Sequence, residues 1–185
     1  MRPSQAETFP RLLPGLLLGG GLVGLVAAFV LAVEKIALLK NPEYVPSCSI
    51  NPVLSCGSIM STPQAELFGF PNPLIGIAGF AVVTTVGVVA VAGIPLPRWF
   101  WIGLQAGVTA GVVFVHWLIY QSLYVIGALC PYCMVVWAVT IPLFTYVTLR
   151  GRRLAPYHGI ILTVWFLAIL ALVLVRFWSY WSTLV

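Results

Sequence analysis

Five long apolar stretches limit what this chain can fold into, because most charged residues lie between them. A helix needs about 20 apolar residues to cross the hydrocarbon core of a bilayer, since each residue adds about 1.5 Å along the helix axis. We expect membrane-spanning helices over five ranges: 12–39, 74–94, 99–124, 130–149 and 157–177. The sequence therefore predicts an all-α membrane protein, built as a single bundle of four or five helices.

Composition supports a membrane protein and argues against other classes. Of the 185 residues, 61% are hydrophobic and 7% are charged, which is more apolar surface than a water-soluble domain needs. The net charge of +5 comes from scattered lysines and arginines, and no basic face interleaved with aromatic residues indicates nucleic-acid binding. The segments outside the apolar stretches are short at both termini, so we expect residues 1–185 to form one transmembrane domain.

The lysines and arginines predict how the helices are oriented in the membrane. If the five spans alternate in direction, six arginines fall on one side: Arg2, Arg11, Arg98, Arg150, Arg152 and Arg153. The other side holds Lys40 and Arg176, with Lys35 near the end of the first span. Cytoplasmic segments carry the excess of positive charge. We therefore expect a multi-pass protein of the inner or plasma membrane, with a cytoplasmic N-terminus and an exoplasmic C-terminus.

The longest connection, residues 40–73, is exoplasmic in this orientation. Its first half is rich in proline, serine and asparagine, which is typical of a loop. Its second half carries helix signals, because Ser61 or Thr62 can cap a helix whose first turn contains Pro63. We expect a short exoplasmic half-helix over the mouth of the bundle, with four apolar residues facing inward: Ile59, Met60, Leu67 and Phe68. An interfacial helix that serves only packing is the alternative.

All four cysteines fall on the exoplasmic side, where disulfides persist. Cys48 and Cys56 lie in the loop, and Cys130 and Cys133 open the fourth span. Two structural disulfides are one interpretation of the even count. A zinc site is another, although the spacing of the two pairs is not that of a zinc ribbon. A soluble glutaredoxin-like domain would need a strand before the second pair, where the third span lies.

The second pair of cysteines favours redox chemistry. Residues three apart share a helix face, so Cys130 and Cys133 can bridge. Such a bridge constrains almost no chain and offers little stability, which leaves a chemical role. Pro131 suits the first helical position, so Cys130 lies near the helix N-cap, where unpaired N–H groups lower the pKa of a thiol.

The direction of the fourth span separates the two sulfurs by depth. Cys133 lies about 4.5 Å deeper than Cys130, because the span runs inward from the exoplasmic side. Cys130 is therefore better placed to meet the loop cysteines, and Cys133 faces the apolar bundle. An electron acceptor that is reached from inside a bilayer should be lipid-soluble, and a quinone fits that requirement.

Four features together resemble one known family. They are the spacing of Cys48 and Cys56, the sequence CGSIMST from Cys56, the sequence FGFPNPLIGI before the second span, and the CPYC motif at Cys130. The chain resembles the vitamin K epoxide reductase family over nearly its whole length. Its features are similar in particular to those of bacterial homologues that oxidise protein thiols.

The resemblance implies a fold, a cofactor and a partner. It implies a four-helix bundle around a quinone of the menaquinone or ubiquinone type, with a fifth helix in bacterial members. In many of those members a thioredoxin-like domain follows the fifth helix. This sequence ends at Val185, so we expect the partner to be a separate exported thioredoxin-like protein.

The resemblance also implies a path for electrons. A reduced thioredoxin-like partner attacks a disulfide between Cys48 and Cys56, at Cys48. The freed Cys56 then attacks Cys130, and Cys133 leaves as a thiolate that reduces the quinone. Each exchange needs a thiolate that attacks in line with a disulfide. In this scheme the mobile loop carries electrons to the fourth span, which stays fixed and passes them to the quinone.

Three further residues match positions near the quinone in the family. Thr62 stands where the family has a serine or threonine, and Asn72 where it has an asparagine that can donate to a quinone oxygen. Trp137 replaces a tyrosine of the vertebrate enzyme and could wall the quinone ring. Each has a simpler interpretation: a helix cap for Thr62, a turn residue for Asn72 and ordinary helix packing for Trp137.

Polar residues within the spans are weaker candidates. His116 could relay protons, since quinone reduction consumes them, or it could only form a hydrogen bond between helices. We expect Glu34, Lys35 and Arg176 to lie near helix ends and to extend their polar groups to the membrane surface. Several glycines of the first span should permit close helix packing: Gly15, Gly19, Gly20, Gly21 and Gly24.

These observations predict a membrane thiol:quinone oxidoreductase that supports disulfide bond formation outside the cytoplasm. One alternative is a quinone or quinone-epoxide reductase whose main role is quinone recycling. A second, non-enzymatic alternative is a membrane scaffold with structural disulfides.

Overall fold

A computed structural model of the chain describes residues 5–183, with side chains from residue 12 onward. Arg2 therefore lies outside the described residues, and so does the side chain of Arg11. Within the described range every regular element is a helix, and five helices are long and apolar enough to cross a membrane. The predicted all-α membrane class is confirmed.

The helices follow the apolar stretches of the sequence. The long ones are α1 (Gln5–Lys40), α3 (Pro73–Val91), α4 (Arg98–Tyr120), α5 (Pro131–Leu149) and α6 (His158–Arg176). A π-helical segment, η2 (Gln121–Ile126), extends α4. The shorter elements are α2 (Cys56–Met60), η1 (Pro63–Glu66), η3 (Ala155–Tyr157) and α7 (Trp178–Trp181).

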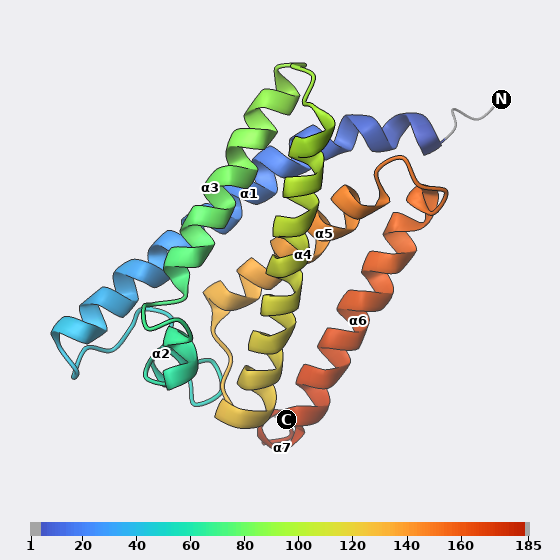
Figure 1. Cartoon of the computed structure of the whole chain (residues 1–185). Helices are drawn as coiled ribbons and strands as arrows, with labels where there is room; N and C mark the ends of the chain where they lie inside the picture. Colours follow the sequence, from blue (N-terminus) through green and yellow to red (C-terminus); the bar gives the residue numbers. More distant parts are fainter. Residues whose placement is uncertain (1–4, 184–185) are drawn as a thin grey trace.

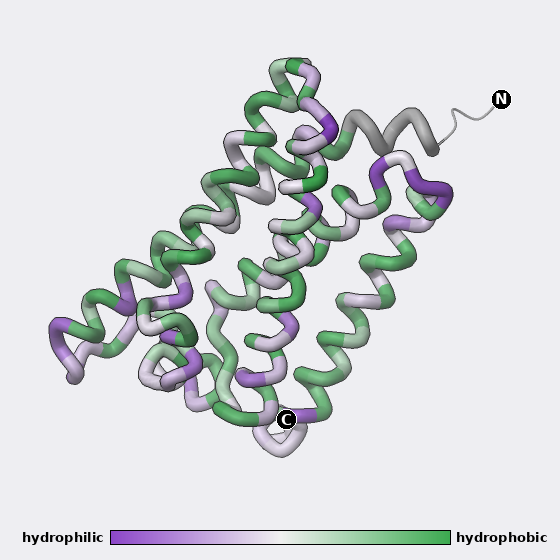
Figure 2. The backbone as a smooth tube through the Cα atoms, viewed as in Figure 1, coloured by the Kyte–Doolittle hydropathy of each residue, from purple (hydrophilic) through white to green (hydrophobic). Residues whose placement is uncertain are grey.

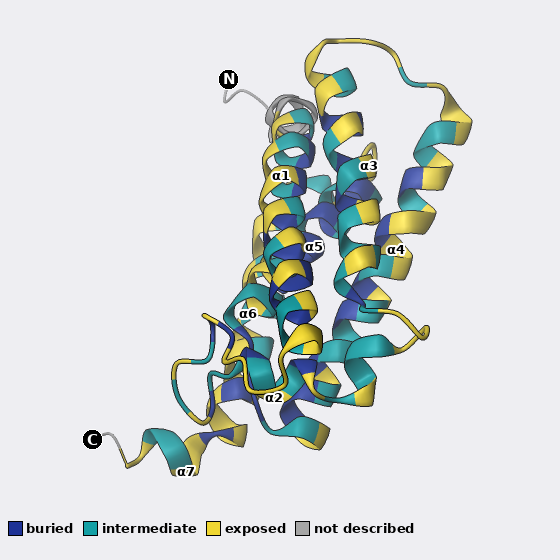
Figure 3. Ribbon diagram, turned by 90° about the vertical axis from the view of Figure 1, so that its left-hand side faces the viewer, coloured by how far each residue is buried: buried dark blue, intermediate teal, exposed yellow. Residues whose placement is uncertain are grey.

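Four helices form a bundle, and the fifth lies along its outside (Figure 1). The helix α1 packs most extensively against α3 and also against α5, while α4 packs against α5. The helix α6 contacts α5 and is the least buried of the five. The long helices are mostly hydrophobic along their length (Figure 2), and their buried positions face the centre of the bundle (Figure 3). Such an outer surface suits a lipid solvent.

Two glycines let α1 and α3 approach closely. A Cβ atom at Gly21 would lie 2.8 Å from the backbone nitrogen of Thr84, and one at Gly87 would lie 2.4 Å from that of Leu18. No larger residue fits at either point unless the helices move apart. Two other glycines of α1 that we expected to permit close packing have no neighbour within 4 Å of such a Cβ: Gly15 and Gly19.

Polar residues inside the bundle pair across helices. Trp165 of α6 donates its indole N–H to Nε2 of His116 at 2.9 Å, and Nδ1 of His116 lies 2.7 Å from the carbonyl oxygen of Val112. Through these contacts the ring of His116 joins α4 to α6. Gln105 donates to the hydroxyl of Thr148 at 2.9 Å and so joins α4 to α5. Of the two interpretations of His116, the contacts match the hydrogen bond between helices.

Two short helices, α2 and η1, occupy the connection between the first two spans. The side chain of Ser55 caps α2, and Thr62 precedes the first residue of η1. Met60 is buried at the end of α2. Leu67 is exposed, so the expectation that it faces inward is wrong. The reason is that η1 is a 3-10 turn of only four residues, so Leu67 follows its last residue and lies outside the helix that was expected to orient it.

The contact between α1 and α3 makes a testable prediction. Gly21→Ala should lower the stability of the protein in detergent by about 1–3 kcal/mol, because the added methyl group meets the backbone of α3. Gly19→Ala is the matched control, since it gains the same helix propensity but meets nothing within 4 Å. Thermal unfolding followed by circular dichroism measures both. Equal midpoints for the two variants would show that the close approach is not needed.

Candidate active site

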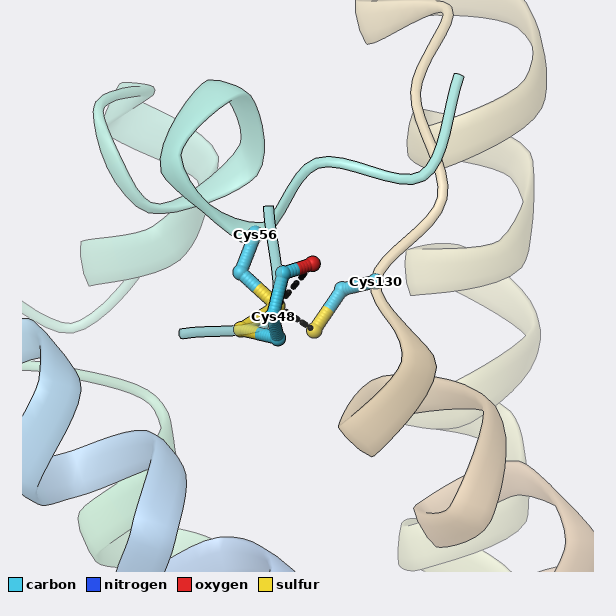
Figure 4. Close-up of side chains that lie close together, drawn as sticks. All are labelled: Cys48, Cys56 and Cys130. Carbon is cyan, nitrogen blue, oxygen red and sulfur yellow. Dashed lines mark hydrogen bonds between the residues drawn. A yellow bond between two sulfur atoms is a disulfide. The ribbon is translucent and has the colours of Figure 1, made fainter. Parts of the chain in front are cut away.

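The sulfur atoms of the two cysteine pairs meet at one end of the bundle. Cys48 and Cys56 form a disulfide, whereas Cys130 and Cys133 are free. The sulfur of Cys130 points at this disulfide and lies 2.9 Å from that of Cys56 (Figure 4). Cys48, Cys56 and Cys130 are buried together, so their sulfurs can exchange partners without water between them.

A backbone pairing sets this contact. Leu129 donates its N–H to the carbonyl of Val53 at 2.7 Å and accepts the N–H of Ser55 at 2.8 Å, which makes an isolated parallel β-bridge. Cys56 follows one strand of the bridge and Cys130 follows the other. The bridge therefore holds both cysteines in register before either helix begins.

The loop before Cys56 is folded by local hydrogen bonds. The side-chain oxygen of Asn51 accepts the backbone N–H of Val53 at 3.0 Å and that of Leu54 at 2.7 Å. The backbone N–H of Ile50 also bonds to the carbonyl of Leu54 at 2.8 Å. Asparagine before proline is a common start for such a turn. The turn presents Val53 to its partner on the other segment.

The second segment of the bridge, which precedes Cys130, follows a helix that is hydrogen-bonded to α6. Gly127 ends the π-helical segment with a φ of 73°, a conformation that glycine adopts readily. Arg176 donates from Nε to the carbonyl of Leu123 in that segment at 2.7 Å. Arg176 is exposed at the end of α6, as expected, and it also holds the neighbouring segment. It satisfies a carbonyl that the widened helix leaves without a partner in the regular pattern.

Cys130 is the N-cap residue of α5, and this position activates its sulfur. The Cys130 sulfur accepts the backbone N–H of Cys133 at 3.5 Å. The side chain of Cys133 donates a further hydrogen bond to it, and this bond is the main cause that lowers the pKa of the Cys130 thiol. Burial opposes the shift, and the backbone N–H groups of Tyr132 and Cys133 reinforce it. Cys130 is thus the better nucleophile for exchange with Cys56.

An apolar cavity begins beside the free cysteines. It has a volume of about 730 Å³ and is lined by α1, α3, α4, α5 and the two short helices, with Cys130 and Cys133 in its wall. A few polar residues also line it: Lys35, Thr62, Gln64, Asn72, Gln121, Ser122 and Thr140. A cavity of this size with few polar groups is typical of a site for a small, largely apolar ligand. The ring of a quinone fits that description.

The sequence model of the vitamin K epoxide reductase family matches residues 15–148. The chain belongs to this family. The match covers the redox loop, the cavity and both cysteine pairs. Membership implies a membrane oxidoreductase that works on thiols and quinones. The buried disulfide and the neighbouring thiol fit that chemistry.

Two of the residues predicted to contact a quinone, Thr62 and Asn72, line the cavity. Both also form hydrogen bonds within α2, η1 and the chain up to Asn72, the part of the cavity lining that we call its roof. Thr62 donates its hydroxyl hydrogen to the carbonyl of Ile59 at 2.7 Å. Asn72 donates to the carbonyl of Gln64 at 2.7 Å and accepts the N–H of Leu67 at 3.1 Å. Asn72 therefore ties η1 to the start of α3, and these bonds use its amide oxygen and one of its two amide N–H groups.

Trp137 also lines the cavity, on the face of α5 below Cys133. Its ring is buried against Val115, Leu123 and Leu129. Within the described part of the chain its indole N–H has no hydrogen-bond partner. A buried donor without a partner is uncommon in native proteins and often marks a functional position.

The cavity also includes a residue that the sequence analysis discounted. Lys35 is buried and lines the cavity wall, although we expected its ammonium group to reach the membrane surface. The sequence did carry a signal for a functional role of Lys35, because a charged residue within an otherwise apolar span is a candidate functional residue. His116 is not among the residues that line the cavity, so no contact supports a role for it there.

Three of the sulfurs are also close enough to hold a metal ion. The sulfur atoms of Cys48, Cys56 and Cys130 all lie within 4.8 Å of one another. Metal ligation uses the thiolate, and two of these sulfurs are joined in a disulfide. In this redox state the cluster is therefore arranged for exchange.

The hydrogen bond between the free cysteines makes a prediction about pH. Cys133→Ser keeps a side-chain donor beside Cys130, whereas Cys133→Ala removes it. Each variant has one free thiol, so its titration is not coupled to a second one. We expect Cys130 to ionise at a lower pH in Cys133→Ser than in Cys133→Ala. Thiolate ultraviolet absorbance measures the two midpoints, and identical midpoints would contradict the assigned cause of the lowered pKa.

Proposed function

We propose that this protein is a membrane thiol:quinone oxidoreductase that takes electrons from an exported thioredoxin-like protein and so supports disulfide bond formation. The observation that carries the proposal is the distance of 2.9 Å between the sulfurs of Cys56 and Cys130. This is the pair between which a disulfide must be exchanged if electrons pass from the loop to α5. No other contact links the two cysteine pairs as directly in the described structure.

Electrons enter at the loop. The thiolate of the partner attacks Cys48, which forms a mixed disulfide and releases Cys56 as a thiolate. The second thiol of the partner then displaces Cys48, so that the partner leaves oxidised. Cys56 attacks Cys130 of a Cys130–Cys133 disulfide, and Cys133 leaves as a thiolate. Cys48 then attacks Cys56, which breaks the Cys56–Cys130 bond; the loop disulfide is restored, and Cys130 and Cys133 are left reduced.

The arrangement of sulfurs corresponds to the product of this exchange. The loop disulfide is closed, and Cys130 and Cys133 are both free beside the cavity. A quinone supplies the capacity to accept two electrons and two protons, which converts the two thiols back into a disulfide. The net reaction joins the two thiols of the partner and turns quinone into quinol.

Three residues are proposed to hold the quinone. Trp137 walls the ring, because its buried side chain lines the cavity close to Cys133 in the sequence. Asn72 donates its remaining N–H to a ring oxygen. Thr62 lines the cavity and holds its roof through the bond to Ile59. These roles account for the few polar groups around an otherwise apolar cavity.

The proposed orientation in the membrane follows from the placement of charge. Arg98 begins α4, and Arg150, Arg152 and Arg153 lie between α5 and α6. These arginines are at the end of the bundle opposite the sulfurs, since both helices run between the two ends. Positive charge favours the cytoplasmic side. The redox site would then face the exoplasmic side, where an exported partner can reach it.

A trapping experiment tests the exchange. In Cys133→Ser, Cys130 can attack Cys56 and release Cys48, but no Cys133 thiol is present to attack Cys130 and resolve the new disulfide, and alkylation of Cys48 prevents the reverse attack. We expect an alkylating reagent to capture Cys48 and leave a Cys56–Cys130 disulfide, identified by mass spectrometry after proteolysis. In the control that carries both Cys130→Ala and Cys133→Ser, Cys48 should stay unlabelled. A scaffold with structural disulfides predicts no labelling of Cys48 in either variant.

Activity measurements test the whole path. We expect quinone reduction by a reduced thioredoxin-like protein to fall by at least about a hundredfold in the alanine variant of each cysteine, because each variant removes one of the sulfurs between which a disulfide is exchanged. Full activity without Cys48 would remove the loop from the path. Quinone reduction that small thiols support fully, with no benefit from the protein partner, would favour the alternative role in quinone recycling.

A further inference from the structure

Two adjacent charged residues lie buried near the end of α1. Glu34 is 7% exposed and Lys35 is 6% exposed, although both belong to an otherwise apolar span. The expectation that they extend to the membrane surface is therefore wrong. Buried charges are stable only when they are paired and hydrogen-bonded. Each of the two is satisfied by a different part of the redox loop, on opposite sides of the disulfide.

Glu34 holds the segment that carries Cys48. Its carboxylate accepts the hydroxyl of Tyr44 at 2.9 Å, the backbone N–H of Ser47 at 3.3 Å and the hydroxyl of Ser47. Ser47 is the residue directly before Cys48. The hydrogen bond from Tyr44 to the carboxylate raises the pKa of the Tyr44 phenol, as a bond to a charged acceptor should. Through these hydrogen bonds Glu34 holds the segment before Cys48 against α1.

Lys35 holds the segment that carries Cys56. Its ammonium group donates to the carbonyl of Met60 at 2.6 Å and lies 2.9 Å from the carboxylate of Glu66. Met60 is the last residue of α2, and Cys56 is the first. Met60 and Lys35 both line the cavity. Lys35 thus fixes the short helix that presents Cys56 and also closes the roof of the cavity.

Access to the disulfide requires that this arrangement opens. Cys48 is 4% exposed, so a protein partner cannot reach its sulfur while the loop is held in this way. The exchange between Cys56 and Cys130, in contrast, needs α2 to stay in place. The two charged residues therefore hold two parts of the loop that have different tasks.

On this basis, and resting on the proposed function, we propose that Glu34 and Lys35 are positioning residues that control the redox loop. Glu34 keeps Cys48 covered until a partner docks. Lys35 keeps Cys56 against Cys130 and the roof over the cavity. Neither residue touches the reacting sulfurs, and each acts through the segment that it holds.

The first measurement tests Glu34 without any quinone or partner. The background carries Cys130→Ala and Cys133→Ser, so no neighbouring thiol opens the Cys48–Cys56 disulfide; a water-soluble phosphine reduces it, and alkylation of Cys48 reports the rate. We expect Glu34→Gln to be reduced about tenfold faster than the same protein with Glu34, because a neutral amide binds Ser47 and Tyr44 more weakly than a carboxylate. Tyr44→Phe should change the rate in the same direction by less. Glu43→Gln is the matched control, since Glu43 is exposed in the same loop.

The second measurement tests Lys35 in a background that lacks Cys48 and Cys133. Only Cys56 and Cys130 remain, and a mild oxidant should join them rapidly because their sulfurs lie 2.9 Å apart. We expect Lys35→Met to slow this reaction about tenfold, and Glu66→Gln to slow it less, since an amide still accepts a hydrogen bond. Lys40→Met, an exposed lysine of the same helix, is the matched control.

The two measurements together separate positioning from general stability. Positioning predicts that Glu34→Gln changes the reduction of the disulfide and leaves the oxidation of Cys56 and Cys130 unchanged, while Lys35→Met slows that oxidation. Equal changes in both measurements that follow the unfolding temperature would overturn the proposal, as would rates equal to those of the wild type. If Lys35→Met does not fold, Glu66→Gln decides the second measurement. Because no quinone is present, failure here leaves the test of the proposed function unaffected.

Discussion

The structure depends on one short backbone pairing between two segments that are far apart in the sequence. Leu129 bonds to Val53 and Ser55, and this bridge brings Cys56 and Cys130 together where two helices begin. Backbone hydrogen bonds have fixed geometry, so they set the distance between the sulfurs more firmly than side-chain packing alone. The Asn51 turn on one side and Gly127 with Arg176 on the other serve this pairing, because each shapes one of its two segments.

Burial gives the sulfurs their chemistry. Cys130 caps α5 with its sulfur toward unpaired N–H groups, and the neighbouring thiol adds a further donor. Water is excluded from Cys48, Cys56 and Cys130, so an exchanging thiolate competes with no solvent hydrogen bonds. The same apolar surroundings continue into the cavity. A lipid-soluble oxidant could therefore reach Cys133 without passing through water.

The membrane spans and the position of Cys130 could be predicted from the sequence, whereas the backbone bridge and the contacts of Glu34 and Lys35 could not. The spans could be predicted because apolar length is a local property, and the position of Cys130 followed from the proline after it. The bridge at Leu129 could not, because no local pattern says which distant backbone groups pair. Glu34 and Lys35 were misjudged for a related reason. The sequence showed charges near a helix end, but their partners, from Tyr44 to Glu66, are supplied by a loop whose path the sequence does not reveal.

The size of α2 links the thiol site to the cavity. This helix has five residues, with Cys56 at its start and Met60, which lines the cavity, at its end. It spans only about 6–8 Å, so it moves as a rigid unit. A displacement of α2 must therefore move Cys56 and Met60 together, and under the proposed function a quinone that packs against Met60 favours the position in which Cys56 meets Cys130. Under the proposed function, thiol exchange and quinone binding are then coupled through α2, without a longer chain of contacts.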